Sequence, residues 1–166
     1  MKDLGPSKKI LGIQIHRDRH EKKLSLSQKE FIEKLLKRFN MTETKLVSTP
    51  LAKHFKFSTT QSPSTNEEKN EMSSIPYSSA VGSLMYAMIC TRPDIAHVVD
   101  TVSKFLSNPG KEYCGAVKWI LRYLKGTSDM ELCFGSGKFE LVCYTNSDLG
   151  GNLDNSKSTS RYLITF

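Results

Sequence analysis

Two carboxylates near the C-terminal end, Asp148 and Asp154, are the first residues to weigh for chemistry on a phosphate. They are the only acidic residues between Cys143 and Phe166, and a pair of glycines lies between them. Cleavage of a phosphodiester by two metal ions needs several converging carboxylates, because the ions lie roughly 3.5–4 Å apart on one phosphate. Two carboxylates without acidic neighbours are more simply explained as turn and surface residues. The residues alone therefore predict no catalytic residue and no metal site here.

A basic cluster at the other end of the chain is the second candidate. It consists of six cations on one expected hairpin: Lys8, Lys9, Arg17, Arg19, Lys22 and Lys23. Such a cluster can follow a phosphate backbone, or it can keep an exposed strand edge from pairing with other strands. The formal net charge of +7 and the pI near 9.2 are compatible with nucleic-acid contact but do not require it. Both interpretations stay open, and the residues alone favour the charged edge.

Composition argues against several other kinds of site. The four cysteines are widely spaced without a Cys-x-x-Cys pair, and the four histidines do not join them at metal-ligand spacing, so we expect buried, reduced thiols and no cofactor. The N-terminal residues contain no apolar signal segment, and no run approaches the roughly 18–20 apolar residues that cross a membrane. We therefore expect an intracellular chain with no membrane partner.

Hydrophobic periodicity predicts the N-terminal elements that would position the basic cluster. Two alternating stretches indicate a β-hairpin over residues 9–26 with a charged tip. Ser27 and Glu30 then have the spacing of a capping box, and an apolar stripe runs from Phe31 to Phe39. Asn40 is a reasonable terminator of this helix.

The rest of the chain divides by composition and period. Residues 58–74 are almost wholly polar and predict a loop or disordered linker. Three helical patterns follow, over Ser78–Cys90, after Thr91 as N-cap, and over Lys111–Lys125, and their apolar stripes predict an antiparallel bundle. Strands are expected over residues 131–134 and 139–144, joined through Gly135–Gly137, and again from Thr159. The predicted fold class is α+β, with an N-terminal hairpin, a small helical bundle and a partial C-terminal sheet.

Several long motifs in this order resemble one known family. Residues 76–86 read PYSSAVGSLMY, residues 91–95 read TRPDI, and residues 116–127 read AVKWILRYLKGT. These motifs resemble the thumb and the connection of reverse transcriptase in the Pol polyproteins of plant copia-type LTR retrotransposons, and residues 1–6 (MKDLGP) and 10–13 (ILGI) resemble the end of its palm. Residues 143–148 read CYTNSD and resemble the opening strand of the ribonuclease H domain in the same polyproteins, which reads Tyr-Thr-Asp-Ala-Asp.

The resemblance implies four segments and an altered metal position. The segments are a palm-end hairpin with a thumb-proximal helix (1–57), a polar linker (58–75), a helical thumb and connection bundle (76–127), and truncated ribonuclease H-like strands (128–166). Asn146 stands where the family has a metal-binding Asp, so the ribonuclease H site is expected to be degenerate and, with the chain ending at Phe166, incomplete. The polymerase strand Tyr-Val-Asp-Asp would lie upstream of Met1.

The resemblance also implies a function. The parent is an RNA-directed DNA polymerase with ribonuclease H that uses Mg²⁺, whereas this chain is expected to have no catalysis of its own. Its expected partners are an RNA–DNA or DNA duplex, contacted through the six cations of the hairpin, and the remainder of the Pol polyprotein. The alternative is a small basic nucleic-acid-binding module retained by a host. A third interpretation, a secreted effector, is opposed by the missing signal segment.

Overall fold

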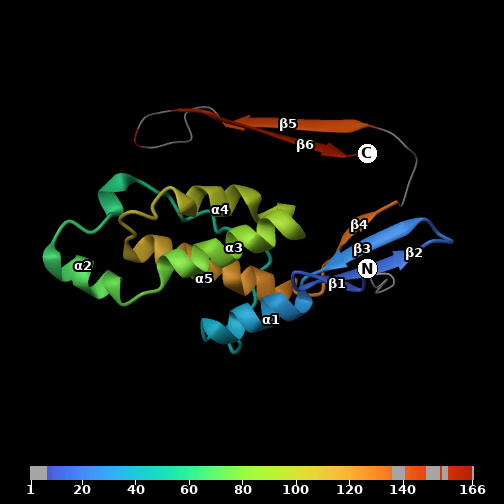
Figure 1. Cartoon of the computed structure of the whole chain (residues 1–166). Helices are drawn as coiled ribbons and strands as arrows, with labels where there is room; N and C mark the ends of the chain where they lie inside the picture. The colour runs from blue at the N-terminus through green and yellow to red at the C-terminus, as the bar shows by residue number, and fades with distance from the viewer. Residues whose placement is uncertain (1–6, 136–140, 149–153, 155–156, 166) are drawn as a thin grey trace, which may run out of the picture.

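The computed structural model describes residues 7–135, 141–148, 154 and 157–165, and it confirms the predicted α+β class (Figure 1). The strands are β1 (Lys9–Ile10), β2 (Ile13–Asp18), β3 (Lys23–Ser27), β4 (Leu132–Phe134), β5 (Val142–Asp148) and β6 (Thr159–Thr165). The helices are α1 (Lys29–Arg38), α2 (Asn66–Ser73), α3 (Tyr77–Cys90), α4 (Ala96–Ser103) and α5 (Lys111–Gly126), with 3₁₀ turns η1 (Thr59–Gln61) and η2 (Pro93–Ile95). Figure 1 shows the helices grouped together, the sheet β1–β4 at one end of them, and β5 with β6 as a separate pair of strands.

The N-terminal hairpin is present as predicted. Strands β2 and β3 pair antiparallel over five residue pairs. The turn between them is closed by Asp18, whose Oδ1 accepts hydrogen bonds from the backbone N–H groups of His20 and Glu21. Side chains alternate along a strand, so the paired residues Ile15 and Leu26 lie on the same face of the hairpin. The charged residues near the turn are exposed, as their position at the tip requires.

The expected partner of the strand near residues 131–134 is wrong. Strand β4 pairs antiparallel with β3, and the sheet order is β1-β2-β3-β4, whereas β5 pairs with β6. Leu132 lies opposite Leu26 and Phe134 opposite Leu24, so the pairing extends the apolar face of the hairpin, which a local hairpin through Gly135 would not do. Part of the expected partner, residues 139–140, lies outside the described residues.

The core lies between α1, α3, α4 and α5. These helices turn their apolar stripes toward one another, which confirms the three predicted helices of the bundle and adds α1 to them. The buried residues that they contribute include Ile32, Leu35, Leu36, Val81, Leu84, Val98, Val99, Val102, Val117, Ile120, Leu121 and Leu124. The sequence also places Met85 and Ile89 on the inner stripe of α3, but their side chains are 37% and 74% exposed.

Neither predicted helix cap forms as expected, because Glu30 and Thr91 bind elsewhere, and Ser27 Oγ accepts from the Lys29 N–H at 3.4 Å in place of Glu30. Helix α1 starts after Gln28 without a side-chain cap, and Glu30 binds strands β1 and β2 and does not return to its own helix end. The turn η2 likewise has no side-chain cap, and the Thr91 hydroxyl donates to Gln28 Oε1 at 2.6 Å. Both Gln28 and Thr91 are buried, and this bond satisfies the Thr91 hydroxyl and Gln28 Oε1, whereas Gln28 Nε2 has no hydrogen-bond partner among the described residues. Asn40 does follow α1 with a φ of 53°, as a terminator should.

The polar stretch after residue 58 is not a plain loop. It contains η1 and α2, and each begins with a capping box, Ser58 with Gln61 and Thr65 with Glu68. Met72 of α2 is buried in the core, which gives this short helix one apolar anchor. The low apolar content hides such a helix from a periodicity argument. The division of the chain into four segments stays a prediction.

Cysteine burial is only partly as expected. Cys114 is buried and Cys90 is half-buried, whereas Cys133 and Cys143 are exposed on strands β4 and β5. The two exposed thiols lie in strands that no further described layer covers, which the alternating pattern alone does not reveal. Among the described helices, none has the length and apolar character needed to cross a bilayer.

Candidate nucleic-acid interface

The N-terminal sheet brings together most of the predicted cations. An open groove along β2, β3 and β4 is lined by five of the six: Lys8, Lys9, Arg17, Arg19 and Lys23. Lys22 lies outside that lining, in the turn before β3, where its φ is 53°. The residues come from both strands of the hairpin and from the segment before it, so the antiparallel pairing is what gathers them. Whether they bind nucleic acid stays a prediction.

Carboxylates neutralise part of this groove: Asp18 and Glu131 belong to its lining, and two other carboxylates pair with its lysines. Lys9 Nζ lies 2.5 Å from Glu30 Oε2, and Gln14 Nε2 donates to Glu30 Oε1 at 2.6 Å. These hydrogen bonds, from Lys9 first and then from Gln14, hold the pKa of Glu30 below its usual value. Lys23 Nζ lies 3.6 Å from Glu21 Oε2. In the described part of the chain, the cations of the cluster without an ion pair are Lys8, Arg17, Arg19 and Lys22.

The altered metal position lies on β5. Asn146 is exposed there, and the register sets it opposite residue 161 of β6. Its side chain can offer a neutral amide oxygen, which neutralises none of the charge of a divalent cation. Within the described ranges, no group of three or more His, Cys, Asp or Glu residues could hold a metal ion. The donors around Asn146 therefore do not fit a pair of divalent cations, and we derive no catalytic step through a metal.

The second candidate carboxylate, Asp154, is a structural contact. Its Oδ1 accepts a hydrogen bond from Ser58 Oγ at 2.6 Å, and both carboxylate oxygens accept from the Thr59 N–H at 3.1 and 3.0 Å. The bond from Ser58, followed by those from Thr59, lowers the pKa of Asp154. This carboxylate is exposed in a turn, as predicted for a surface residue, but it is not without partners, because it caps η1.

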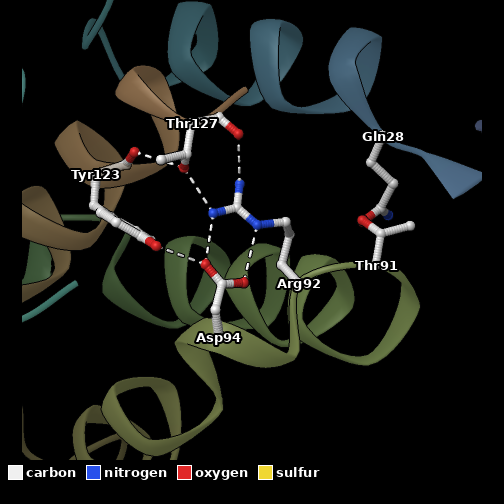
Figure 2. Close-up of polar contacts among 6 residues, drawn as sticks. All are labelled: Gln28, Thr91, Arg92, Asp94, Tyr123 and Thr127. Carbon is white, nitrogen blue, oxygen red and sulfur yellow. Dashed lines mark hydrogen bonds and ion pairs between the residues drawn. The ribbon is translucent and has the colours of Figure 1, made fainter. Parts of the chain in front are cut away.

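The motif Thr-Arg-Pro-Asp-Ile at residues 91–95 forms a buried polar cluster (Figure 2). The Arg92 side chain is 2% exposed, and its Nε and one terminal nitrogen donate to the two oxygens of Asp94 at 3.0 and 2.7 Å. The guanidinium also donates to the Thr127 carbonyl at 3.0 Å and to the Thr127 hydroxyl at 2.6 Å. Tyr123 donates its phenol proton to Asp94 Oδ2 at 2.8 Å. The cluster ties the junction of α3 and α4 to the end of α5, which is a structural role.

Polar contacts also fix the sheet against the helices. The Tyr86 hydroxyl of α3 donates to the Leu11 carbonyl between β1 and β2. Lys29 Nζ at the start of α1 lies 2.6 Å from Asp129 Oδ1, just before β4. The groove therefore has a defined position relative to the core, although few apolar side chains join the two.

A second group of cations was not singled out by the sequence. It lies on α5 and on the segment before η1: Lys45, Lys53, Lys56, Lys118, Arg122 and Lys125. Its members are spread over 81 positions, from residue 45 to residue 125, so no local run marks them. The available signal was a lack of acids, because residues 44–66 and 113–128 contain no Asp or Glu.

Comparison with known proteins finds clear relatives. The chain is 60% identical over all 166 residues to the Retrovirus-related Pol polyprotein from transposon TNT 1-94 of Nicotiana tabacum, and it covers 12% of that protein. It is 36% identical over 142 residues to the Retrovirus-related Pol polyprotein from transposon RE1 of Arabidopsis thaliana, of which it covers 9%. It is also 43% identical over 94 residues to the Secreted RxLR effector protein 161 of Plasmopara viticola, of which it covers 66%.

The chain thus spans a small part of the two polyproteins, 12% and 9% of their lengths. No family model matches the sequence, and no solved structure matches it. The relatives, and not a fold comparison, therefore identify the sequence.

Proposed function

The chain belongs to the copia-type retrotransposon Pol polyproteins, and on this premise we propose that it is a noncatalytic segment that contacts nucleic acid. The parent in this proposal is an RNA-directed DNA polymerase with ribonuclease H. The segment would hold a template–primer duplex, RNA–DNA or DNA, through backbone contacts. Its other partner would be the remainder of the Pol polyprotein.

The observation that carries the proposal is the groove on the N-terminal sheet. Its lining includes Lys8, Arg17 and Arg19, which make no ion pair with the described carboxylates. When cations without an ion pair bind the phosphates of a nucleic acid, condensed counterions are released, and this release favours binding. An edge that only discourages strand pairing would need charge, but not a groove. The geometry therefore supports the phosphate-binding interpretation over the charged edge that the residues alone favour.

Three features of the residues support the noncatalytic part of the proposal. The 166 residues contain no adjacent pair of aspartates of the polymerase type. The ribonuclease H position carries Asn146, and the Asp154 carboxylate is bound to η1. Neither set supplies the converging carboxylates that two metal ions require. Mg²⁺ chemistry in this proposal belongs to the intact parent.

The binding part is tested with a labelled 20-base-pair RNA–DNA hybrid by fluorescence anisotropy at 50–200 mM NaCl. The binding constant K falls as salt rises, so the slope of log K against log [salt] is negative. We expect the variant Lys8→Gln/Arg17→Gln/Arg19→Gln to reduce the magnitude of this slope by about 2–3, since each lost phosphate contact removes about 0.9. The control, Lys69→Gln/Lys104→Gln/Lys111→Gln, also removes three positive charges, but from exposed positions outside the lining of the groove. Equal slopes in the two variants would remove the groove from the proposal.

The catalytic part is tested on the same purified chain with Mg²⁺ or Mn²⁺. We expect no primer extension and no cleavage of the hybrid, and we expect Asn146→Asp not to restore cleavage. The substitution returns one carboxylate, whereas several must converge on the metal ions. Cleavage of the hybrid by the Asn146→Asp variant, at a rate that scales with its concentration, would contradict the noncatalytic assignment.

The second candidate function is a freestanding nucleic-acid-binding module, and one observation supports the freestanding part of it. The chain covers 66% of the Plasmopara viticola relative, so related sequence occurs in proteins much shorter than a polyprotein. The two candidates differ in the size of the expressed product. Mass spectrometry that finds peptides of this chain together with upstream polymerase peptides in one band supports the polyprotein. A product of about the size of this chain supports the module.

A further inference from the structure

Two acid-free segments pack against each other on the helical side of the molecule. Residues 44–57 run along α5, and three side chains of α5 bind backbone carbonyls of that segment. Trp119 Nε1 donates to the Thr49 carbonyl at 2.9 Å, Arg122 Nε to Lys45 at 2.6 Å, and Lys125 Nζ to Thr44 at 2.8 Å. These bonds are spaced along about two turns of the helix, and they fix residues 44–49 of the segment.

Aromatic contacts hold the same segment. The His54 ring lies 4.3 Å from the Phe55 ring and 5.8 Å from the Trp119 ring, the latter edge to face. The Arg122 guanidinium lies 5.0 Å from the centre of the Trp119 ring. Phe55 and Phe57 pack against the core. The lysines between these rings are therefore carried by an ordered backbone.

The cations of these two segments form one group, which we call the α5 cationic face: Lys45, Lys53, Lys56, Lys118, Arg122 and Lys125. In the described part of the chain, none of the six makes an ion pair, and Glu43, which precedes the segment, makes none with them. Other lysines are paired, such as Lys104 with Asp100 and Lys111 with Glu71. The charge of the face is therefore not neutralised by the neighbouring described residues.

The spacing along α5 matches a phosphate backbone. Positions 118, 122 and 125 lie on one side of the helix, and a rise of 1.5 Å per residue separates the first from the last by about 10 Å. One strand of duplex carries a phosphate about every 3.4 Å along its axis, so this row covers about three phosphates. Lys118 of this row is exposed, whereas Arg122 and Lys125 are half-buried and donate to carbonyls of the neighbouring segment. Lys45, Lys53 and Lys56 of that segment are exposed.

We propose that the α5 cationic face is a second phosphate-binding surface, which contacts the backbone of a nucleic-acid duplex apart from the groove on the N-terminal sheet. The proposal rests on the proposed function and extends it to the helical side of the molecule. The aromatic rings on this face contact one another, and the Trp119 N–H is already bonded. In this proposal the face therefore binds phosphates and does not stack on bases. An anionic membrane is less suited, because Phe55 and Phe57 pack inward and Leu46 is the one large apolar side chain of residues 44–57 that is exposed, whereas a membrane-bound face turns several apolar side chains out.

Three variants of the full chain, each with three fewer charges, test the proposal with the same labelled hybrid. The α5 variant is Lys53→Gln/Lys56→Gln/Lys118→Gln, and it is compared with the groove variant and with the control at residues 69, 104 and 111. We expect the α5 variant to lower the salt slope by about 2–3 and the affinity at 100 mM NaCl on the order of tenfold. Replacing the same three lysines by Arg keeps the charge and should retain binding, and thermal melting shows that each variant is folded.

The outcomes separate this proposal from the proposed function. If the α5 variant behaves as the control does while the groove variant loses binding, the second surface is wrong and the first stands. If the unsubstituted chain does not bind the hybrid, the proposed function fails and this proposal with it. If the α5 variant keeps its affinity for the hybrid but no longer binds vesicles of phosphatidylserine and phosphatidylcholine, the face is a membrane contact and the proposal is overturned.

Discussion

Replacing Arg92 by Ala is expected to lower the free energy of unfolding by about 3 kcal/mol, the lower end of the range for breaking a buried ion pair. The guanidinium is almost fully buried and makes four hydrogen bonds, to Asp94 and to Thr127. Its loss removes the two guanidinium donors of the Asp94 carboxylate, which keeps the bond from Tyr123, and one donor of the Thr127 carbonyl, which keeps the Met130 N–H. The Asp94 side chain is 35% exposed and can take water in compensation, which sets the lower end. Thermal melting should fall by about 6–12 °C for a chain of this size.

Matched variants separate the buried cluster from a general loss of an arginine. Arg17→Ala removes an exposed side chain without an ion pair among the described residues and should change stability by less than about 0.5 kcal/mol. Arg92→Lys keeps the charge but cannot reach Asp94 and Thr127 together, so it should fall between the two. A melting temperature of Arg92→Ala within 2 °C of that of the unsubstituted chain would show that the cluster does not hold α5 to the junction of α3 and α4.

The same cluster gives an acid-dependent signature. Burial raises the pKa of Asp94, but the hydrogen bonds from Arg92 and Tyr123 and the charge of Arg92 outweigh it, so the pKa lies below its usual value. A carboxyl with a lower pKa in the folded state stabilises the fold fully above its unfolded pKa of about 3.9 and loses this contribution as pH falls through the folded value. The difference in free energy of unfolding between the unsubstituted chain and Arg92→Ala should therefore be constant near neutral pH and shrink below about pH 4.

Local patterns explain what the sequence could predict of the fold. The hairpin and α3, α4 and α5 follow from alternation and from apolar stripes, which depend only on neighbouring residues. The pairing of β4 with β3 joins residues more than 100 positions apart, since Leu26 lies opposite Leu132. Periodicity predicts a strand but not its partner. We expected residues 131–134 to pair with the nearest strand in the sequence, residues 139–144. The predicted cap at Thr91 is wrong for a similar reason, because the Thr91 hydroxyl donates to Gln28, which is 63 positions away in the sequence.

The candidate site divides in the same way. The cations of the N-terminal groove are close in sequence, so their assembly on one hairpin could be predicted. Their neutralisation could not, because Glu30 reaches Lys9 from the next helix. The α5 cationic face combines residues from a segment without regular structure and from a helix that begins more than 50 positions later. Tertiary contacts bring them together, among them the bonds from Trp119 to Thr49 and from Arg122 to Lys45.

The polar stretch after residue 58 differs most from expectation, and its contacts show why. Tyr113 of α5 donates its phenol proton to the Ser58 carbonyl at 2.5 Å, and the Asn108 amide donates to the Pro63 carbonyl at 3.2 Å. Gly110 closes this contact, because a Cβ at that position would lie 2.2 Å from the Gln61 carbonyl oxygen. The segment is therefore held by polar bonds and by one close backbone approach, neither of which gives an apolar pattern.

Gly110→Ala should open this segment. A methyl group cannot stand 2.2 Å from a backbone oxygen, so the η1 turn must move away, at a cost of about 1–3 kcal/mol typical of overpacking. We expect trypsin to cut at Lys69 of α2 about tenfold faster, since 1.4 kcal/mol of local stability corresponds to a factor of ten in the open population. In the unsubstituted chain, the bonds from Tyr113 and Asn108 should keep Lys69 protected relative to Lys22 in the exposed hairpin turn.

Gly82→Ala is the matched control, with the same added methyl group in the middle of α3. A Cβ at Gly82 meets no atom within 4 Å, so the substitution adds helix propensity without a clash and should raise stability by about 0.5–1 kcal/mol. Tryptic cleavage at Lys69 should be unchanged in this variant, because α3 gains no contact with η1. Equal cleavage in the two alanine variants would mean that Gly110 does not hold η1 against α5, and that residues 58–75 form the loose linker that the sequence predicts. Faster cleavage in Gly110→Ala alone would establish that the segment is an ordered part of the helical body.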